Sequence, residues 1–99
     1  DRDYRGRLVE AAVGAHLANA AALGECELHY WREGDREVDF VVRSGRRLVA
    51  IEVKSGRERR APAGMADFAA AFRPAATLLV GGEGIPLERF LLAPVSRWL

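Results

Sequence analysis

Apolar side chains recur every three or four positions along the first part of the chain. Residues 4–22 are rich in alanine and contain no proline, and both features favour a helix. The period and the small side chains predict an amphipathic helix that packs closely on a sheet, and Gly24 is placed to end it. The expected buried stripe consists of Val9, Val13, Leu17 and Ala20, widened by Leu8, Ala12 and Ala15.

From residue 27 onward the apolar side chains alternate, and glycine-containing turns interrupt the pattern. This predicts two hairpins, with turns at Gly34-Asp35 and Ser44-Gly45. The predicted elements are strands over 27–32, 36–43 and 46–54, a short helix over 65–72, a buried strand over 77–82, a last short strand over 89–93, and a terminal turn or helix after Pro94.

The resulting element order is α, β, β, β, α, β. It predicts an α/β (α+β) fold in which a mixed central sheet is flanked by helices. At 99 residues the chain is one domain's worth of sequence, so residues 1–99 are expected to form a single domain.

The second hairpin can be given a register, because directly opposed residues of an antiparallel pair point to the same face. A two-residue loop at Ser44-Gly45 places Phe40 opposite Val49. One face then carries only apolar side chains: Val38, Phe40, Val42, Val49, Ile51 and Val53. The other face carries Glu37, Asp39, Val41, Leu48, Ala50, Glu52 and Lys54.

Two carboxylates meet on this second face. The register places Asp39 diagonal to Glu52, roughly 7–8 Å apart between backbones, with the small Ala50 between them. Carboxylates at this spacing can close around a cation such as Mg²⁺, whose oxygen ligands lie at about 2.0–2.1 Å. Buried charges are costly unless they are paired or bound to metal, so a hard-metal site is the functional interpretation.

Lys54 is the one lysine in a chain that otherwise uses arginine for its basic side chains. A lysine is a compact point charge, suited to orienting a metal-activated water or to stabilising charge that develops on a phosphate. The alternative is a salt bridge between Lys54 and Glu52 or Asp39 at the strand end.

Three arginines follow Lys54 closely in the sequence. They are Arg57, Arg59 and Arg60, in a polar segment that also carries Pro62 and is expected to be a loop. Clustered positive charge at this place either contacts a phosphate backbone or keeps the loop soluble. The first interpretation makes the three arginines candidate nucleic-acid-binding residues.

The other polar residues have structural interpretations. Arg32 lies opposite Glu37 and is expected to form an ion pair with it. Tyr30 lies opposite Asp39, where it either hydrogen-bonds the carboxylate or simply packs. The remaining expectations are His29 and Trp31 on the apolar face with Phe40 and Val38, His16 structural or exposed, and Cys26 a buried free thiol.

Composition excludes several classes of protein. The net charge of +1 imposes no nucleic-acid binding, and one cysteine excludes an internal disulfide and any multi-cysteine metal site. No apolar run is long enough to span a membrane, and a cytoplasmic location is expected. The chain starts at Asp1 and its one methionine is Met65, so we expect a segment of a longer protein.

The motif residues resemble the PD-(D/E)xK, or restriction-endonuclease-like, nuclease superfamily. They are Glu10 on the first helix, Val38-Asp39 on the second strand and Glu52-Val53-Lys54 on the third. More narrowly, GRLVEAAVGAHL, HYWREGDREVDFVV, LVAIEVKSG and FLLAPVSRWL resemble the uncharacterised domain found C-terminal to AAA+-type ATPases in bacteria and archaea. Valine stands before Asp39 where many superfamily members have proline.

The resemblance implies an αβββαβ nuclease core and metal-dependent hydrolysis of DNA. Mg²⁺ or Mn²⁺ would be bound by Asp39, Glu52 and the Val53 carbonyl, with Lys54 as the catalytic lysine and Glu10 completing the site. An ATPase domain N-terminal to the chain is the implied partner. The alternatives are a catalytically weak or inert module for DNA or partner binding beside that ATPase, and a homodimerisation or docking domain using Trp98, Phe90 and Leu91.

Overall fold

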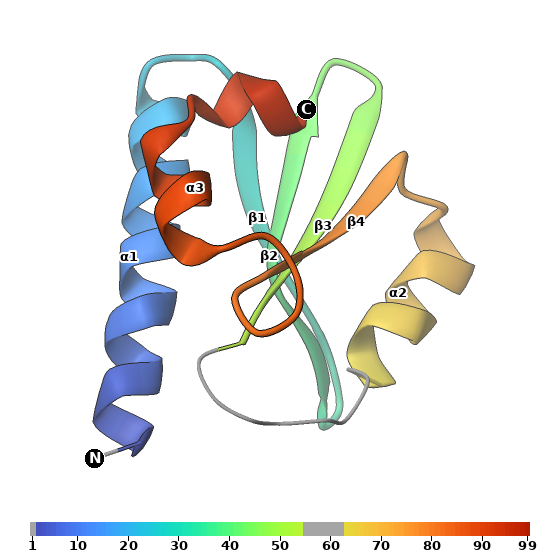
Figure 1. Ribbon diagram of the computed structural model, residues 1–99. Helices are drawn as coiled ribbons and strands as arrows, with labels where there is room; N and C mark the ends of the chain where they lie inside the picture. Colours follow the sequence, from blue (N-terminus) through green and yellow to red (C-terminus); the bar gives the residue numbers. More distant parts are fainter. Residues whose placement is uncertain (1, 55–62) are drawn as a thin grey trace.

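The computed structural model describes residues 2–54 and 63–99 as a four-stranded mixed sheet between two helical layers (Figure 1). The strand order is β1-β2-β3-β4, with antiparallel pairing except between β3 and β4, which are parallel. The predicted fold class and element order are confirmed. The elements are α1 (Arg2–Ala22), β1 (Glu27–Glu33), β2 (Arg36–Ser44), β3 (Arg47–Val53), α2 (Ala63–Phe72), β4 (Ala76–Val80), α3 (Leu87–Leu92) and the 3₁₀ helix η1 (Val95–Trp98).

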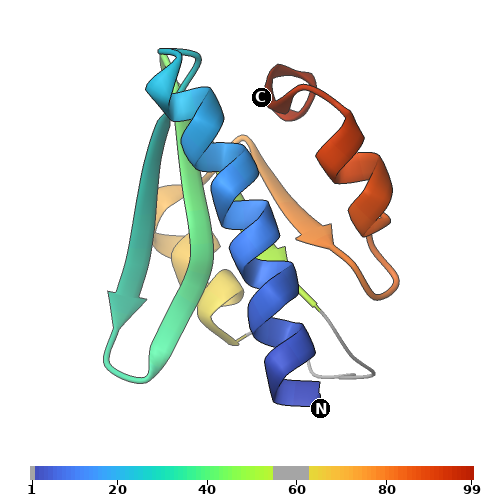
Figure 2. The ribbon, with the colours of Figure 1, turned by 90° about the vertical axis from the view of Figure 1, so that its left-hand side faces the viewer.

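The two faces of the sheet are covered by different helices. In Figure 2, α1 lies diagonally across one face, with α3 and η1 beside it, and α2 lies behind the sheet. The larger core lies under α1, α3 and η1, and the smaller one under α2. The larger core contains Val13, Leu17, Ala20, Cys26, Phe40, Val42, Val49, Ile51, Val80, Phe90 and Val95; the smaller contains Val38, Val41, Ala50 and Phe68.

Helix α1 ends at Ala22 as predicted and begins two residues earlier than predicted, at Arg2. Gly24 has a positive φ of 78°, and the N–H of Glu25 donates to the Ala20 carbonyl oxygen at 3.0 Å, as in a glycine-terminated helix. The buried stripe is narrower than predicted, because Leu8 and Ala15 are exposed on the side of α1 that points away from the sheet. No helix in the described ranges is both long and apolar enough to cross a membrane.

The second hairpin turns one residue later than predicted. Ser44 pairs with Arg47, so the loop is Gly45-Arg46, and Phe40 pairs with Ile51 rather than with Val49. Gly45 has a φ of 60° and occupies the first loop position, where a two-residue turn with a single positive φ needs glycine. The register therefore moves by two residues, which leaves the predicted parity of the side chains in this hairpin unchanged.

A β-bulge interrupts the pairing of β1 with β2. On one side of it His29 pairs with Val41, and on the other side Trp31 pairs with Val38, so one residue of β1 spans two residues of β2. A bulge of this kind breaks the strict alternation of side chains between the two faces of a strand. The side chains of β2 on the two sides of the bulge therefore do not follow one continuous alternation, and Val38 and Val41 point to the same face of the sheet.

The bulge turns Val38 toward α2. Val38 is buried in the smaller core with Val41, Ala50 and Phe68, and the prediction that it lies beside Phe40 is wrong for this reason. The predicted polar face is accordingly hydrophobic along much of its length and is closed by α2. What remains polar is confined to the end of the sheet near the β1–β2 turn and the end of β3.

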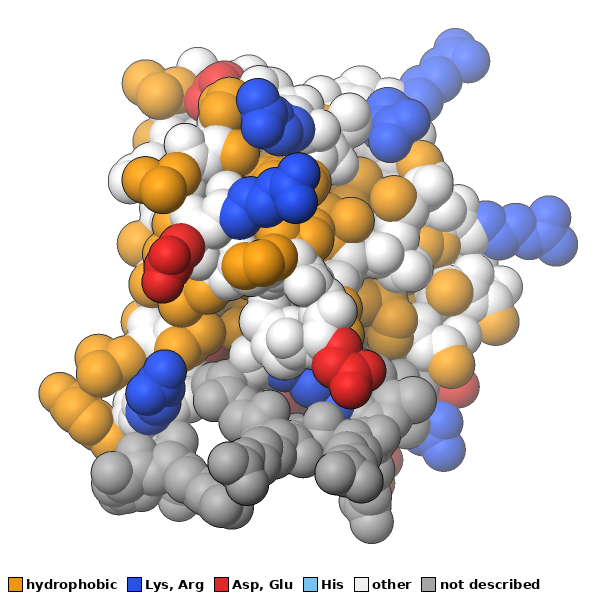
Figure 3. Space-filling view, viewed as in Figure 1, with side chains coloured by type: hydrophobic (Ala, Val, Ile, Leu, Met, Phe, Trp, Pro, Cys, Tyr) orange, Lys and Arg blue, Asp and Glu red, His pale blue; other side chains and the backbone are white. Residues whose placement is uncertain are grey.

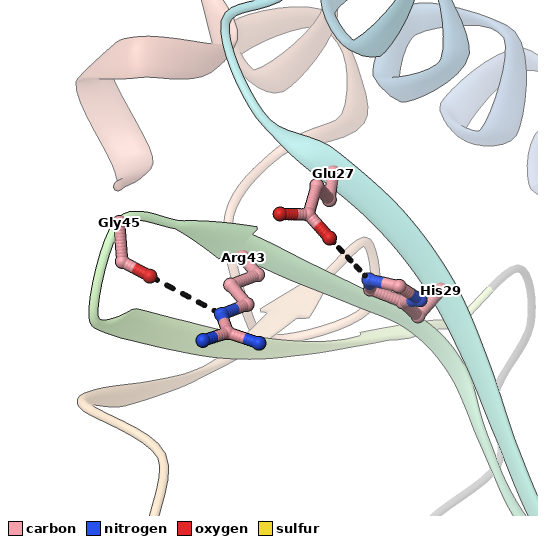
Figure 4. Close-up of polar contacts among 4 residues, drawn as sticks. All are labelled: Glu27, His29, Arg43 and Gly45. Atoms are coloured by element: carbon pink, nitrogen blue, oxygen red, sulfur yellow. Dashed lines mark hydrogen bonds and ion pairs between the residues drawn. The ribbon is translucent and has the colours of Figure 1, made fainter.

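Strand β1 also departs from the prediction. Trp31 lies on the α2 side, with its ring centroid 5.5 Å from that of Phe68 and 6.4 Å from that of Phe72. His29 is exposed rather than in the core, and its Nε2 lies 3.2 Å from Oε1 of Glu27 (Figure 4). The extra residue of the bulge lies on β2, so His29 pairs with Val41 instead of Phe40. Both His29 and Trp31 therefore lie on the α2 side of the sheet.

The segment predicted as a last strand, 89–93, is helical. It forms most of α3, and the N–H of Phe90 donates to the Pro86 carbonyl oxygen at 3.0 Å. A short continuous apolar run does not distinguish a helix from a strand by periodicity, and Pro86 is well suited to precede a first helical turn. Phe90 is fully buried and stacks on Trp98 with centroids 5.7 Å apart, so neither ring forms an exposed docking surface.

The structural roles predicted for His16 and Cys26 are confirmed. His16 Nε2 donates to the Ala93 carbonyl oxygen at 2.9 Å and its ring lies edge-on to Phe90, which ties α1 to α3. Cys26 is a free, buried thiol. Burial, and secondarily the negative charge of Glu25, raises the pKa of Cys26, so it remains a neutral apolar side chain.

Candidate metal site

Acidic side chains from three elements lie close to one another at one end of the sheet. They are Glu10 on α1, Glu37 and Asp39 on β2, and Glu52 on β3, here called the acidic site. Asp39 and Glu37 act electrostatically on both Glu10 and Glu52, which shows that the four carboxyls share one neighbourhood. The structure thus brings together the three acidic residues singled out from the sequence, and it adds Glu37.

Asp39 is held in place by the backbone of β3. Its Oδ2 accepts a hydrogen bond from the Val53 N–H at 2.8 Å, and the residue is half-buried. The β2–β3 backbone pairing extends to Phe40 and Ile51, so beyond it the side chain of Asp39 supplies the acceptor that a continued strand would have supplied. The bulge at this point of β2 is what allows a side chain to take that role.

Glu52 has the most perturbed carboxyl of the site. Its Oε2 is buried and has no hydrogen-bond partner among the described residues. Burial raises the pKa of Glu52 from 4.5 to about 8, and the adjacent carboxyl of Asp39 contributes to the increase. At neutral pH this carboxyl therefore holds its proton unless a positive charge comes to lie beside it.

Glu10 faces the same group from α1. Its side chain is exposed, and partial burial followed by the negative charges of Asp39 and Glu37 raises its pKa. Glu10 therefore lies within electrostatic reach of Asp39 and Glu37, and its role in an active site stays a prediction. A carboxyl at this place lies at the solvent side of the acidic site.

Lys54 directly follows β3, two residues after Glu52, and is half-buried. Its backbone N–H donates to the Val80 carbonyl oxygen at 2.8 Å, which attaches the end of β3 to β4. Lys54 therefore lies at the same end of the sheet as the acidic site.

The three candidate nucleic-acid-binding arginines are not among the residues that the structure describes. Arg57, Arg59 and Arg60 lie outside the described residues, which end at 54 and resume at 63. The expectation that they contact a phosphate backbone therefore stays a prediction from the sequence, as does the alternative that they keep the segment soluble.

The donor set fits a hard divalent cation. Its oxygens are carboxylates, and one of them is buried without a partner among the described residues. Burial and the negative charges around Glu10 and Glu52 raise the pKa of both, as expected where a positive charge is needed. Across residues 2–54 and 63–99, no three His, Cys, Asp or Glu side chains are arranged as a complete metal centre. Magnesium commonly takes only one or two protein carboxylates and keeps several waters, and Asp39 with Glu52 meets that requirement.

Two cross-strand expectations around the site have different outcomes. Tyr30 is 70% exposed and its ring packs 5.8 Å from that of Phe40, which is the packing alternative rather than a bond to Asp39. Arg32 pairs in register with Glu37 as predicted, but its Nε donates to the Gly34 carbonyl oxygen, and no ion pair with Glu37 is among the described contacts. Glu37 therefore belongs with the acidic site. The sequence indicated this position, because Glu37 and Asp39 are two residues apart on one strand and are expected to point to the same face.

A second polar link lies outside the acidic site. Arg36 Nη1 and Asp67 Oδ2 are 2.6 Å apart and join β2 to α2. At the other hairpin, Arg43 Nε donates to the Gly45 carbonyl oxygen at 3.2 Å across the turn (Figure 4). Both contacts are exposed, and we assign them to the fold rather than to the site.

The loop after β4 fixes the position of Lys54. Gly81 has a φ of 86°, and a side chain there would overlap the Lys54 carbonyl oxygen. Its N–H donates to the Ile85 carbonyl oxygen at 2.7 Å, which holds the loop in this tight form. The end of β3 therefore keeps its place because residue 81 has no side chain.

Gly81→Ala is expected to cost about 1–2 kcal/mol more in unfolding free energy than Gly82→Ala, because both variants carry the strain of a left-handed residue and only Gly81→Ala adds an overlap with backbone. Gly82 also has a positive φ, of 57°, but a Cβ there meets only the Lys54 Cβ at 3.4 Å, an ordinary contact. Urea denaturation of the two variants measures the difference, and equal stabilities would contradict this role of Gly81.

Comparison with known proteins identifies one family. The family described as Domain of unknown function (DUF4143) matches residues 5–98, nearly the whole chain. Comparisons with curated proteins and with solved structures give no match. On the strength of the match over 5–98, the chain belongs to the DUF4143 family.

Proposed function

We propose that this chain is a divalent-metal-dependent nuclease-like domain that hydrolyses DNA phosphodiester bonds. The observation that supports it most is the pair formed by Asp39 and Glu52, in which one Glu52 oxygen is buried and without a hydrogen-bond partner among the described residues. The motif resemblance to PD-(D/E)xK nucleases supports the same assignment from the sequence side.

A bound cation would remove the electrostatic penalty of the acidic site. Two adjacent carboxyls in a half-buried place cannot both ionise easily, so Glu52 retains its proton well above the usual pKa. A divalent ion supplies the missing positive charge and a ligand for the unpartnered oxygen. We therefore assign Asp39 and Glu52, with the Val53 carbonyl, as the residues that hold Mg²⁺ or Mn²⁺.

Each residue then has a defined task. The metal, when bound, would lower the pKa of a water and polarise the phosphate. Asp39 would remain oriented by the Val53 N–H, and Glu52 would release its proton to solvent on becoming a ligand. Lys54 stabilises charge that develops on the phosphate, and Glu10 orders solvent at the open side of the site.

Contact with DNA is expected near the end of β3. On the face in Figure 3, the described Lys and Arg side chains are scattered from the upper edge to the lower margin, with hydrophobic side chains between many of them. A net charge of +1 is consistent with such a distribution. No large basic patch among the described residues on this face marks a DNA-binding surface. We assign phosphate contact to Lys54 because it lies at the acidic site, and to Arg57, Arg59 and Arg60 because they follow it closely in the sequence.

A second candidate is an inert nuclease-fold module for DNA or partner binding beside an AAA+-type ATPase domain. It is favoured by the lack of a complete three-ligand centre within residues 2–54 and 63–99. Both candidates share the fold and the acidic site. They differ in whether metal binding leads to cleavage.

Plasmid cleavage tests the proposed activity. Wild type is expected to nick supercoiled plasmid in Mg²⁺ or Mn²⁺ and to stop on addition of a chelator, and Lys54→Met is expected to slow cleavage by at least about tenfold. Arg47→Met is the matched control, because it removes a positive charge from the exposed far end of β3. No cleavage by wild type in either metal leaves the inert module, and equal rates for wild type and Lys54→Met would remove Lys54 from the mechanism.

A further inference from the structure

The outer face of α1 is apolar over its whole described length. Val13, Leu17 and Ala20 are buried against the sheet. A surface helix normally carries polar side chains on the opposite side. Here that side carries six exposed residues, called the outer seam: Tyr4, Leu8, Ala11, Ala15, Ala18 and Ala22. No other described element covers α1 from outside in Figure 2.

The spacing of the outer seam is that of a helix–helix interface. Its residues follow one another at alternating intervals of four and three, which is the heptad pattern in which one helix packs along another. Alanine at four of the six positions allows two helix axes to approach to about 8 Å, the close end of the usual range. The seam therefore fits a helix better than a strand or a small molecule.

The side chains of the outer seam become smaller from its N-terminal to its C-terminal end, and this difference in size indicates which partner fits it. Tyr4 and Leu8, which are 59% and 51% exposed, lie at the N-terminal end, and the alanines occupy the rest. We propose that the outer seam binds the same seam of a second copy of this chain in antiparallel orientation. Tyr4 then packs over Ala22 of the second copy and Leu8 over Ala18, large against small at both ends.

A parallel arrangement would fit less well. It would place Tyr4 against Tyr4 and Leu8 against Leu8, and these side chains would hold the helices apart where the alanines should meet. The antiparallel arrangement brings Ala11 of each copy opposite Ala15 at the centre, where the axes can approach most closely. Its two contacts are equivalent, as a two-fold symmetric dimer requires.

The charges around the seam favour the same orientation. Arg5 and Arg7 are exposed beside the N-terminal end of the seam, while the last turn of α1 contains no basic residue and is followed by the exposed Glu25. Helix C-termini carry partial negative charge and are stabilised by nearby cations. In the antiparallel dimer the arginines of each copy lie near the last turn and Glu25 of the other; in a parallel dimer they would face one another.

Analytical ultracentrifugation of the 99-residue chain and two variants tests the dimer. Wild type is expected to show a concentration-dependent monomer–dimer equilibrium, and Ala15→Glu is expected to raise the dissociation constant at least about tenfold, because it places two charges at the centre of the seam. Ala15 is exposed in the monomer and Glu is a good helix former, so circular dichroism and the melting temperature should be unchanged.

Ala70→Glu is the matched control, since it makes the same change at an exposed position of α2. It is expected to dimerise as wild type does. A wild type that remains monomeric across concentrations would overturn the proposal, as would an Ala15→Glu variant that dimerises as well as wild type.

Disulfide trapping tests the orientation. Leu8→Cys and Ala18→Cys chains, mixed and oxidised, are expected to cross-link at least about fivefold more than either variant alone, because position 8 of one copy lies beside position 18 of the other and a disulfide needs its two Cα atoms close together. In a parallel dimer each variant would cross-link with itself, and that outcome would refute the antiparallel arrangement. Cys26 is buried, and oxidised wild type gives the background for all three samples.

Discussion

Glu52→Gln is expected to abolish a fall in stability with pH: the unfolding free energy of wild type is expected to drop by about 1–2 kcal/mol between about pH 5 and pH 8. In the unfolded chain this carboxyl ionises near 4.5, and in the folded chain its pKa is about 8. Between these values the folded state holds the extra proton, so raising the pH favours unfolding. Because Glu52 is only half buried, solvent screens part of the effect and keeps the expected fall small.

Urea denaturation at several pH values measures this dependence. Glutamine keeps the shape of Glu52 and cannot ionise, so the variant should lose the fall that begins above about pH 5. Glu33→Gln, which changes an exposed carboxyl at the end of β1, is the control and should keep the wild-type profile. If wild type is equally stable at pH 5 and pH 8, the burial of Glu52 beside Asp39 has no energetic consequence and the account is wrong.

Asp39→Ala is expected to lower the unfolding free energy by about 1–3 kcal/mol, and Asp39→Asn by much less. Alanine leaves the half-buried backbone of Val53 without its acceptor, whereas asparagine still offers a carbonyl oxygen to the N–H that Asp39 binds at 2.8 Å. The two substitutions therefore separate the structural role of the side chain from its charge.

Chemical denaturation of both Asp39 variants at neutral pH measures the difference. Asp35→Ala, in the exposed turn between β1 and β2, serves as the control for loss of an aspartate. Equal losses for Asp39→Ala and Asp39→Asn would mean that the charge, rather than the hydrogen bond to Val53, stabilises this end of the sheet.

Much of the fold could be predicted from periodicity. The alanine-rich pattern of residues 4–22 specifies one helix. The alternation around Phe40 and Ile51 assigns both residues to one apolar face, which in the structure lies under α1, even though the turn lies one residue later. A shift of two residues preserves side-chain parity, so the error in the loop did not disturb the faces of that hairpin. The same parity placed Asp39 near Glu52.

The bulge could not be predicted from the same pattern. It lies between Val38 and Val41, where the sequence VDFV is compatible with uninterrupted alternation. Only the pairing with β1 shows that Asp39 belongs to an irregular segment, and that irregularity frees its carboxylate for the Val53 N–H. The feature that shapes the site is therefore a tertiary one.

The segment 89–93 shows a second limit of periodicity. Its apolar run is too short to show a helical period, and the helix forms because Phe90 is buried against Trp98 and below α1. Glu37 shows a third limit. Periodicity placed it on the face of Asp39, but its cross-strand partner Arg32 offered a local explanation for its charge. Its electrostatic effect on Glu10 and Glu52 places it in the acidic site.

We expect Asp39 and Glu52 together to hold one divalent cation. Calorimetric titration of the wild-type chain with Mg²⁺ or Mn²⁺ at about pH 8, where half of the Glu52 carboxyls are ionised, tests it most directly. Wild type is expected to bind one ion per chain with millimolar or tighter affinity, and Asp39→Asn, which is expected to retain the fold, should bind at least about 100-fold more weakly. No binding by wild type, or equal binding by the two proteins, would contradict it.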